Sequence, residues 1–260
     1  MQGKVVVITG ASGGIGAAAA SAVASRGGSV ALVARREREL RAVAERCGSN
    51  ALSVVADVTK RAQVQRAIRA AIEHFGHIDV LVNNVGRGIT RLPTALTDED
   101  IDDMIQINIK SVIYGVQEIL PHFIQRGTGQ IVNVSSMLGR VPMASFRSAY
   151  NGAKHFLNAM TWNIRQELSE SAPGVVVSLV SPPVVATEFG VNALHGGPDS
   201  RSLPFPQNVD EVGHVIAWVI ETRKLDVYTR PGSKPRVTEF LSTLGEDPPA
   251  PVLAGEWDAA

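Results

Sequence analysis

Tyr150 and Lys154 form the residue pair in this sequence with the clearest chemical potential. The stretch Tyr150-Asn151-Gly152-Ala153-Lys154 sets a phenol and an ammonium four residues apart, so both project from one face if the segment is helical. A tyrosine loses its proton near about pH 10, but a fixed positive charge nearby favours the phenolate and lowers that value. The pair is therefore a candidate proton donor and acceptor. Taken alone, the same spacing also fits a half-buried core aromatic followed by a solvated lysine.

A glycine-rich turn near the amino terminus is a candidate phosphate-binding element. The apolar run from 5 to 9 predicts a strand, and the alanine-rich segment from 15 to 25 predicts a helix. Glycines between them let the backbone approach a pyrophosphate, and the free N–H groups at the helix start supply the positive end of a dipole. The spacing is GxxxGxG rather than the usual GxGxxG, and a purely structural glycine turn is the alternative. The candidate contact residues are Gly10, Ser12, Gly14, Ile15 and Gly16.

The end of the second predicted strand, residues 29–34, indicates the choice of cofactor. A site for NAD usually has an acidic residue there that accepts hydrogen bonds from the ribose. This sequence reads Ala34-Arg35-Arg36 and offers no carboxylate before the next helix, 37–47. A guanidinium stays charged and donates in a planar fork, which suits a 2′-phosphate, so we predict NADP(H). Arg35 is the principal candidate, because Arg36 at the helix start can simply point to water. A solvated helix start is the alternative for both.

Two further predicted strands, 52–56 and 78–82, end in residues suited to a binding site. The first leads into a helix that Thr59 is expected to cap. The second delivers side-chain amides and a glycine, which can order neighbouring backbone beside a cofactor but would be unremarkable as a plain turn. The residues singled out at these two strand ends are Asp57, Val58, Asn84 and Gly86.

Polar residues also interrupt two apolar segments in the middle of the chain. Residues 98–126 predict a long helix pair whose wide apolar band is broken by Asn108. A buried asparagine needs hydrogen-bond partners, so Asn108 is either a satisfied structural amide or a residue that holds something in a site. Residues 130–134 predict a strand buried on both faces, which ends in Ser135-Ser136.

Strands and helices alternate along the chain, which predicts an α/β protein with a single doubly wound, Rossmann-type parallel sheet and helices on both faces. The helix that carries Tyr150 and Lys154 spans 148–171, and a further buried strand spans 175–180. Such a sheet binds ligands beyond the carboxyl ends of its strands, where the candidate residues lie. We expect one dinucleotide-binding catalytic domain over residues 1–245.

Two segments near the carboxyl end have no regular period. Glycine and proline cluster between 187 and 208, and so long an excursion in a compact domain suggests a mobile cover over the substrate site. A helix over 209–221 and a short strand over 227–229 follow it. The last residues, 246–260, contain Pro248-Pro249-Ala250-Pro251 and are expected to form a flexible tail.

The composition limits the kinds of partner. Lysine plus arginine and aspartate plus glutamate number 25 each, so no global field draws the chain to nucleic acid or an anionic membrane, and we expect a small-molecule partner. Cys47 is the single cysteine, which excludes an internal disulfide and a cysteine-clustered zinc site, and no metal is expected. No apolar run is long enough to span a bilayer. We therefore expect a soluble, cytoplasmic protein.

Taken together, these motifs resemble the short-chain dehydrogenase/reductase family from about residue 5 to residue 187. The residues that carry the resemblance are Thr9-Gly10-Ala11-Ser12-Gly13-Gly14-Ile15-Gly16, Asp57-Val58, Asn83-Asn84-Val85-Gly86, Asn108, Ser136, Tyr150 and Lys154. Members of this family commonly pair through their two long helices, here 98–126 and 148–171. The resemblance therefore implies a homodimer or homotetramer.

The resemblance also implies a division of labour in hydride transfer. Tyr150 would be the acid/base, and Lys154 would hold the nicotinamide ribose and lower the pKa of Tyr150. Ser136, rather than the competing Ser135, would polarise the substrate carbonyl. Asn108 would fix a water in the proton relay. The other cofactor contacts that the resemblance implies are Asp57 and Val58 beside the adenine, Asn84, Gly86, Pro182 and Thr187.

The chain departs from the family pattern at three places. Val85 replaces the usual alanine, which should cost no function, and Pro183 replaces a glycine, which stiffens the backbone and removes an N–H beside the nicotinamide. The carboxyl end, residues 226–232, lacks the glycine-rich closing segment of the 3-oxoacyl-carrier-protein reductases.

These observations predict an NADP(H)-dependent carbonyl reductase or secondary-alcohol dehydrogenase. The alternative enzyme is a 3-oxoacyl-thioester reductase that acts on acyl-carrier-protein substrates. The alternative outside enzymes is a dinucleotide-sensing protein, which would be expected to lack one of the four catalytic residues, and none is missing.

Overall fold

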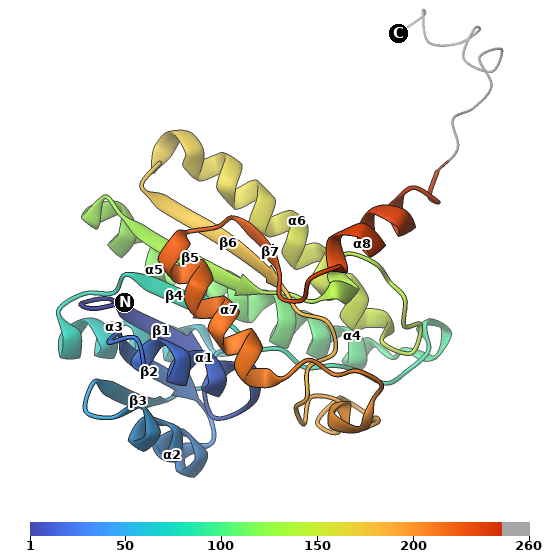
Figure 1. Ribbon diagram of the computed structural model, residues 1–260, viewed down its shortest axis with the longest axis horizontal. Coiled ribbons are helices and arrows are strands. Elements are labelled where there is room, and N and C mark those ends of the chain that lie inside the picture. The colour runs from blue at the N-terminus through green and yellow to red at the C-terminus, as the bar shows by residue number, and fades with distance from the viewer. Residues whose placement is uncertain (246–260) are drawn as a thin grey trace, which may run out of the picture.

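A seven-stranded parallel sheet runs through the protein, whose computed structural model describes residues 1–245 (Figure 1). The strand order is β3-β2-β1-β4-β5-β6-β7, so the direction of winding reverses between β1 and β4. A reversal of this kind opens a crevice at the carboxyl ends of the strands. The strands are β1 (Val5–Thr9), β2 (Ser29–Ala34), β3 (Ala51–Val55), β4 (Val80–Asn83), β5 (Gly129–Val134), β6 (Val175–Ser181) and β7 (Asp226–Tyr228). The predicted single, doubly wound sheet is confirmed.

Helices cover both faces of the sheet (Figure 1). The α-helices are α1 (Gly14–Ala24), α2 (Glu37–Cys47), α3 (Arg61–Phe75), α4 (Asp98–Ile105), α5 (Ser111–Arg126), α6 (Ser148–Ser171), α7 (Val209–Thr222) and α8 (Ser233–Leu241). One apolar core lies between the sheet and α1, α2 and α7, and a second lies between the sheet and α3, α5 and α6. Successive residues of β1 alternate between them, because side chains of a strand point to opposite faces: Val6 and Ile8 enter the first core, and Val5 and Val7 the second.

Two local expectations are corrected. Thr59 does not cap α3, because the residue before that helix is Lys60 and no side chain caps it. Thr59 instead donates from Oγ1 to Asp57 Oδ1 at 2.8 Å and closes a turn with it. The sequence reading also missed α8, whose Pro235 looks like a helix breaker. A proline in the first turn removes no hydrogen bond, because the N–H groups there have no intrahelical partner.

The predicted helix pair over 98–126 is one continuous helical run with a defect in the middle. Between α4 and α5 the backbone widens into a π-helical turn, Gln106–Lys110. Asn108 lies at the centre of this turn and is fully buried. Such turns are rare in proteins, and those that occur are often found at functional sites.

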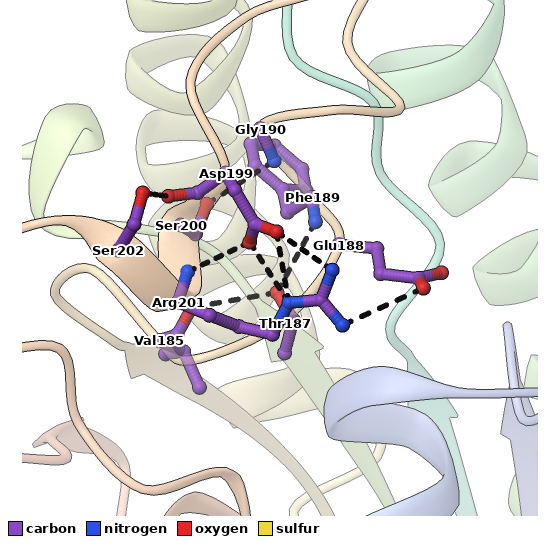
Figure 2. Close-up of polar contacts among 9 residues, drawn as sticks. All are labelled: Val185, Thr187, Glu188, Phe189, Gly190, Asp199, Ser200, Arg201 and Ser202. Atoms are coloured by element: carbon purple, nitrogen blue, oxygen red, sulfur yellow. Dashed lines mark hydrogen bonds and ion pairs between the residues drawn. The ribbon is translucent and has the colours of Figure 1, made fainter.

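The segment between β6 and α7 has the irregular course expected for it, with one short 3₁₀ turn at Ser200–Ser202. Its own side chains hold it together (Figure 2). Arg201 pairs with Asp199 at 2.6 Å and with Glu188 at 3.7 Å, and Gly190 donates its N–H to Ser200 Oγ at 3.1 Å. Ion pairs and hydrogen bonds within the segment thus stabilise its conformation. Its predicted movement as a cover stays a prediction.

No helix within residues 1–245 is both long and apolar enough to cross a membrane. The expected tail, residues 246–260, lies outside the described residues.

Candidate active site

A cavity of about 1420 Å³ opens at the carboxyl ends of the strands. Most of the residues singled out in the sequence line it, including the glycine-rich turn, the ends of β2, β3 and β4, and the tyrosine and lysine of α6. Two predicted residues do not line it: Gly16 and Asn108 lie behind its wall. The lining residues among the predicted set are Gly10, Ser12, Gly14, Ile15, Arg35, Arg36, Asp57, Val58, Asn84, Gly86, Ser136, Tyr150, Lys154, Pro182 and Thr187.

The glycine-rich turn is fixed by the end of β4. Asn84 donates its backbone N–H to Thr9 Oγ1 at 2.9 Å and its side-chain amide to Thr9 O at 3.0 Å. Gly16 is required by a close approach, because a Cβ there would lie 2.4 Å from Gly10 O. Gly14 begins α1 with a φ of +53°, and a Cβ built there would meet only Thr187, whose methyl carbon would lie 3.5 Å away. The turn therefore leaves bare backbone at a helix start, the arrangement that binds phosphate groups.

The two arginines after β2 behave differently from each other. Arg36 donates from Nε to Ser12 Oγ at 3.2 Å and from Nη2 to Ser12 O at 3.3 Å. The expectation that Arg36 points to water is therefore wrong, because its guanidinium folds back onto the glycine-rich turn. Arg35 is exposed and makes no hydrogen bond or ion pair to any described residue. Both line the cavity.

Asp57 and Val58 form the cavity wall at the end of β3. Asp57 Oδ1 accepts hydrogen bonds from the backbone N–H and the hydroxyl of Thr59, at 3.0 and 2.8 Å. The Asp57 N–H in turn donates to Gln63 Oε1 at 2.8 Å. Val58 is buried beside them. The carboxylate thus shapes the wall and Val58 supplies an apolar surface.

Tyr150 lines the cavity and is 6% exposed. Its ring packs against Phe189, with ring centroids 5.4 Å apart. Burial raises the pKa of the phenol to about 12, while a hydrogen bond with Ser136 and the positive charge of Arg147 act to lower it. Tyr150 is therefore protonated at neutral pH in this arrangement.

Lys154 lies one helical turn further along α6 and is 2% exposed. Its Nζ donates to Val134 O at 3.0 Å and lies 5.7 Å from the centroid of the Tyr150 ring. Burial lowers the pKa of this ammonium to about 8. A Cβ on Gly86 would lie 3.4 Å from Nζ, so the lysine reaches the cavity between the ends of β4 and β5.

The two adjacent serines after β5 have separate roles. Ser135 donates to Asn158 Oδ1 at 2.6 Å and is directed to the helix that carries Tyr150. Ser136 faces the cavity beside Tyr150, and its hydroxyl accepts from Leu138 N at 3.1 Å. Ser136 and Tyr150 thus lie within hydrogen-bonding reach of each other, and the role of Ser136 towards a substrate stays a prediction.

Asn108 is a satisfied structural amide in this structure. Its Oδ1 accepts from Arg87 N at 3.1 Å, and its Nδ2 donates to Arg87 O at 3.0 Å and to Met104 O at 3.3 Å. The side chain thereby fixes the backbone next to Gly86, in the wall of the cavity. Of the two possibilities for Asn108, the hydrogen bonds bear out the satisfied amide. The water-holding role stays a prediction.

Two residues of the site were missed in the sequence. Phe189 packs on Tyr150 from the irregular segment, where no pattern marks it. Arg147 precedes Tyr150 by one helical turn, is 7% exposed, and lines the cavity. Its spacing of three residues from Tyr150 was the available signal, since residues three apart on a helix are neighbours.

Comparison with known proteins assigns the family. The short chain dehydrogenase family model matches residues 4–196. An uncharacterised oxidoreductase of Staphylococcus epidermidis is 36% identical over 228 residues, which cover 88% of this chain and 97% of that protein. The chain belongs to the short-chain dehydrogenase/reductase family.

Two solved structures share the fold. A short-chain dehydrogenase/reductase from Burkholderia phymatum in complex with NAD superposes with a TM-score of 0.84, at 25% identity over 96% of this chain and 98% of that one. An alcohol dehydrogenase from Thermococcus sibiricus complexed with 5-hydroxy-NADP gives a TM-score of 0.75, at 27% identity over 86% of this chain and 95% of that one. One of the two therefore holds NAD and the other an NADP derivative.

Proposed function

We propose that the protein is an NADP(H)-dependent oxidoreductase that moves a hydride between nicotinamide and a carbonyl compound or secondary alcohol. The observation that carries this proposal is the placement of Tyr150 and Ser136 side by side, in the same cavity as a glycine-rich turn that opens a helix. One part of the cavity thus suits proton transfer, and the other suits a dinucleotide.

The residues of the cavity fit a bound dinucleotide phosphate. The turn presents backbone without side chains at Gly13 and Gly14, and a Cβ at Gly13 would lie 2.9 Å from Arg36 Nη2. The guanidinium of Arg36 thus lies against the glycine-rich turn. Ala34 ends β2 without a carboxylate for the ribose hydroxyls of NAD, and Arg35 is free to turn towards a 2′-phosphate. These positive charges favour NADP(H).

The bound cofactor would supply or accept the hydride at its nicotinamide ring. The chain itself would manage the proton and the substrate oxygen. Ser136 would donate a hydrogen bond to that oxygen, and Tyr150 would give it a proton during reduction or remove one during oxidation. Lys154 would bind the ribose through its ammonium, and Asn108 would hold the backbone of Arg87 in place.

The direct test is a panel of ketones, aldehydes and secondary alcohols, followed by the absorbance of NADPH or NADP. The proposal expects turnover of at least one carbonyl class with NADPH. Binding of NADPH without turnover of any panel member would favour a dinucleotide-sensing protein instead.

A second candidate is reduction of 3-oxoacyl thioesters. The observation in its favour is a set of exposed apolar side chains on the cavity lining, which could cover an acyl chain. These residues are Met143, Phe146, Val184 and Phe205. Acetoacetyl thioesters in the same panel separate the two candidates, because a simple carbonyl reductase would prefer the free ketone.

A further inference from the structure

Arg147 carries a buried charge that has no carboxylate partner within residues 1–245. Its Nη1 donates to Ile89 O at 3.2 Å and to Thr90 Oγ1 at 3.0 Å. Both acceptors are neutral. Burying a charge is costly unless another charge or dense hydrogen bonding compensates it. A neutral donor could make the same two hydrogen bonds, so these bonds do not require a positive charge at this position.

The guanidinium is held in a fitted slot. A Cβ on Gly88 would lie 3.1 Å from Nη1, and a Cβ on Gly197 would lie 3.2 Å from Nη2. The ring of Phe146 lies 5.3 Å from Cζ, within the range of a cation–π contact. The positive charge is therefore fixed in position, one helical turn before Tyr150.

The charged groups around Tyr150 leave Arg147 without a competing anion. Helix α4 packs against α6 and carries the buried Asp100, but both of its oxygens are occupied. Oδ1 lies 2.6 Å from His195 Nε2, and Oδ2 lies 2.8 Å from Arg91 Nη1. On α6 itself the charged side chain nearest to Tyr150 in the chain is Lys154, which is also a cation, whereas the carboxylates Glu167 and Glu170 lie at the far end of the helix. Ser136 is a polar but uncharged neighbour of the phenol, and the members of the core cluster around Tyr150, including Phe189, are apolar.

We propose that Arg147 is a positioning residue whose fixed charge stabilises the phenolate form of Tyr150. During reduction of a carbonyl, the Tyr150 O–H bond breaks and its proton passes to the substrate oxygen, whose carbon receives the hydride. The phenol is left as an anion, and Arg147 supplies a counter-charge in addition to that of Lys154, whose Nζ lies 5.7 Å from the centroid of the ring. During alcohol oxidation the phenolate takes the proton back. The catalytic consequence rests on the proposed function, whereas the electrostatic effect on the phenol does not.

The mutual influence of the two groups is consistent with this. The charge of Arg147 acts to lower the pKa of Tyr150, and Tyr150 acts to raise the pKa of Arg147. A positive charge within about 4–6 Å of an acid typically lowers its pKa by about one to three units, so the size of the shift measures how close the guanidinium lies to the phenol oxygen.

Three variants separate charge from hydrogen bonding. Arg147→Gln keeps an uncharged N–H donor on a shorter side chain and removes the charge. Arg147→Lys keeps the charge but lacks the planar fork. Tyr150→Phe identifies the signal of Tyr150 among the three tyrosines of the chain.

The experiment is a titration of the phenol by fluorine NMR. Each protein is labelled with a fluorinated tyrosine. The fluorinated phenol is more acidic than that of tyrosine, so it titrates at a lower pH, where unfolding by alkali is less of a concern. We expect the Tyr150 midpoint of Arg147→Gln to lie about one pH unit or more above the unsubstituted protein. The midpoint of Arg147→Lys should stay close to it. An unchanged midpoint in a folded Arg147→Gln protein would overturn the inference. If that variant does not fold, a midpoint in Arg147→Lys raised by about one unit or more would overturn it.

The same proteins show which of the two proposals fails. A raised midpoint in Arg147→Gln together with no turnover by the unsubstituted protein would contradict the proposed function alone. Turnover that depends on Tyr150, together with an unchanged midpoint, would contradict the role of Arg147 alone. Where alcohol oxidation is measurable, the pH at which kcat/KM reaches half its plateau should move upward in Arg147→Gln and not in Arg147→Lys.

Discussion

Arg36 donates from Nε and Nη2 to the hydroxyl and carbonyl oxygens of Ser12, at 3.2 and 3.3 Å. A guanidinium thus lies on the glycine-rich turn. It comes from just beyond the end of β2, where the chain has no carboxylate. Arg35 beside it is exposed and free to move. Under the proposal of NADP(H), we expect both side chains to contact the 2′-phosphate, with Arg36 in place before binding and Arg35 moving towards the phosphate on binding.

The first prediction concerns cofactor choice. Hydrogen bonds to charged groups contribute roughly 1.5–3 kcal/mol, and about 1.4 kcal/mol is tenfold in affinity, so one good arginine contact supplies about a ten- to hundredfold preference for NADPH. Arg35→Ala and Arg36→Ala should each raise KM for NADPH far more than for NADH, with kcat at saturation nearly unchanged. Arg38→Ala, in the same helix start but outside the cavity lining, is the matched control. Equal loss of both cofactors would contradict the assignment of NADP(H).

The second prediction concerns Lys154. Burial lowers its pKa from 10.5 to about 8, so between these values the unfolded chain binds a proton that the folded chain does not. Stability then rises with pH across this window, by up to about 1.4 kcal/mol per pH unit. Tyr150 has the opposite effect only above pH 10, since burial raises its pKa from 10.0 to about 12.

The measurement is denaturant unfolding of the protein without cofactor between about pH 8 and pH 10. The unfolding free energy of the unsubstituted protein should rise relative to that of Lys154→Met, a variant of similar volume without a titratable group. A difference between the two proteins that stays constant with pH would show that Lys154 is charged in the folded state.

The third prediction is that the protein forms at least a homodimer through its long helices. Exposed apolar side chains on this side of the molecule include Phe156 and Trp162 on α6 and Ile124 on α5. A charge at Trp162 should weaken the pairing, because it would be desolvated in an interface. We expect Trp162→Glu to shift the light-scattering mass towards the monomer, whereas Trp218→Glu on α7 should not. A monomeric mass for the unsubstituted protein at micromolar concentration would contradict the prediction.

The fourth prediction is that residues 187–208 close over the substrate. The contacts of Arg201 with Asp199 and Glu188 hold this segment together (Figure 2). Arg201→Ala should therefore speed cleavage of the segment by thermolysin, and NADPH with a substrate should slow it in both proteins. Cleavage in the segment that these ligands fail to suppress would argue against a cover.

The sequence predicted the fold, and it singled out most of the residues that line the cavity, because both depend on local patterns. Apolar runs separated by amphipathic helices specify a parallel sheet, and its topology brings the strand ends together. Gly10, Asn84 and Ser136 could therefore be assigned to one edge before any geometry was known. The spacing of Tyr150 and Lys154 placed them on one helix face, and the motifs that precede them in the chain made the pair a candidate for chemistry.

The features that the sequence did not predict depend on tertiary contacts. The π-helical turn at Asn108 accompanies hydrogen bonds to the backbone of Arg87, which is 21 positions away in the chain. The direction of Arg36 depends on Ser12, and the role of Phe189 depends on where an irregular segment folds back. None of these has a period or a spacing that a pattern could show.

The central claim is that Tyr150 transfers the proton during hydride transfer. The measurement that tests it most directly is the comparison of Tyr150→Phe with the unsubstituted protein, using NADPH binding by fluorescence and kcat on the best carbonyl substrate of the panel. The substitution removes only the hydroxyl, so we predict that the Kd for NADPH stays within about threefold while kcat falls by about a hundredfold or more. Substantial kcat in a folded, NADPH-binding Tyr150→Phe protein would contradict the mechanism.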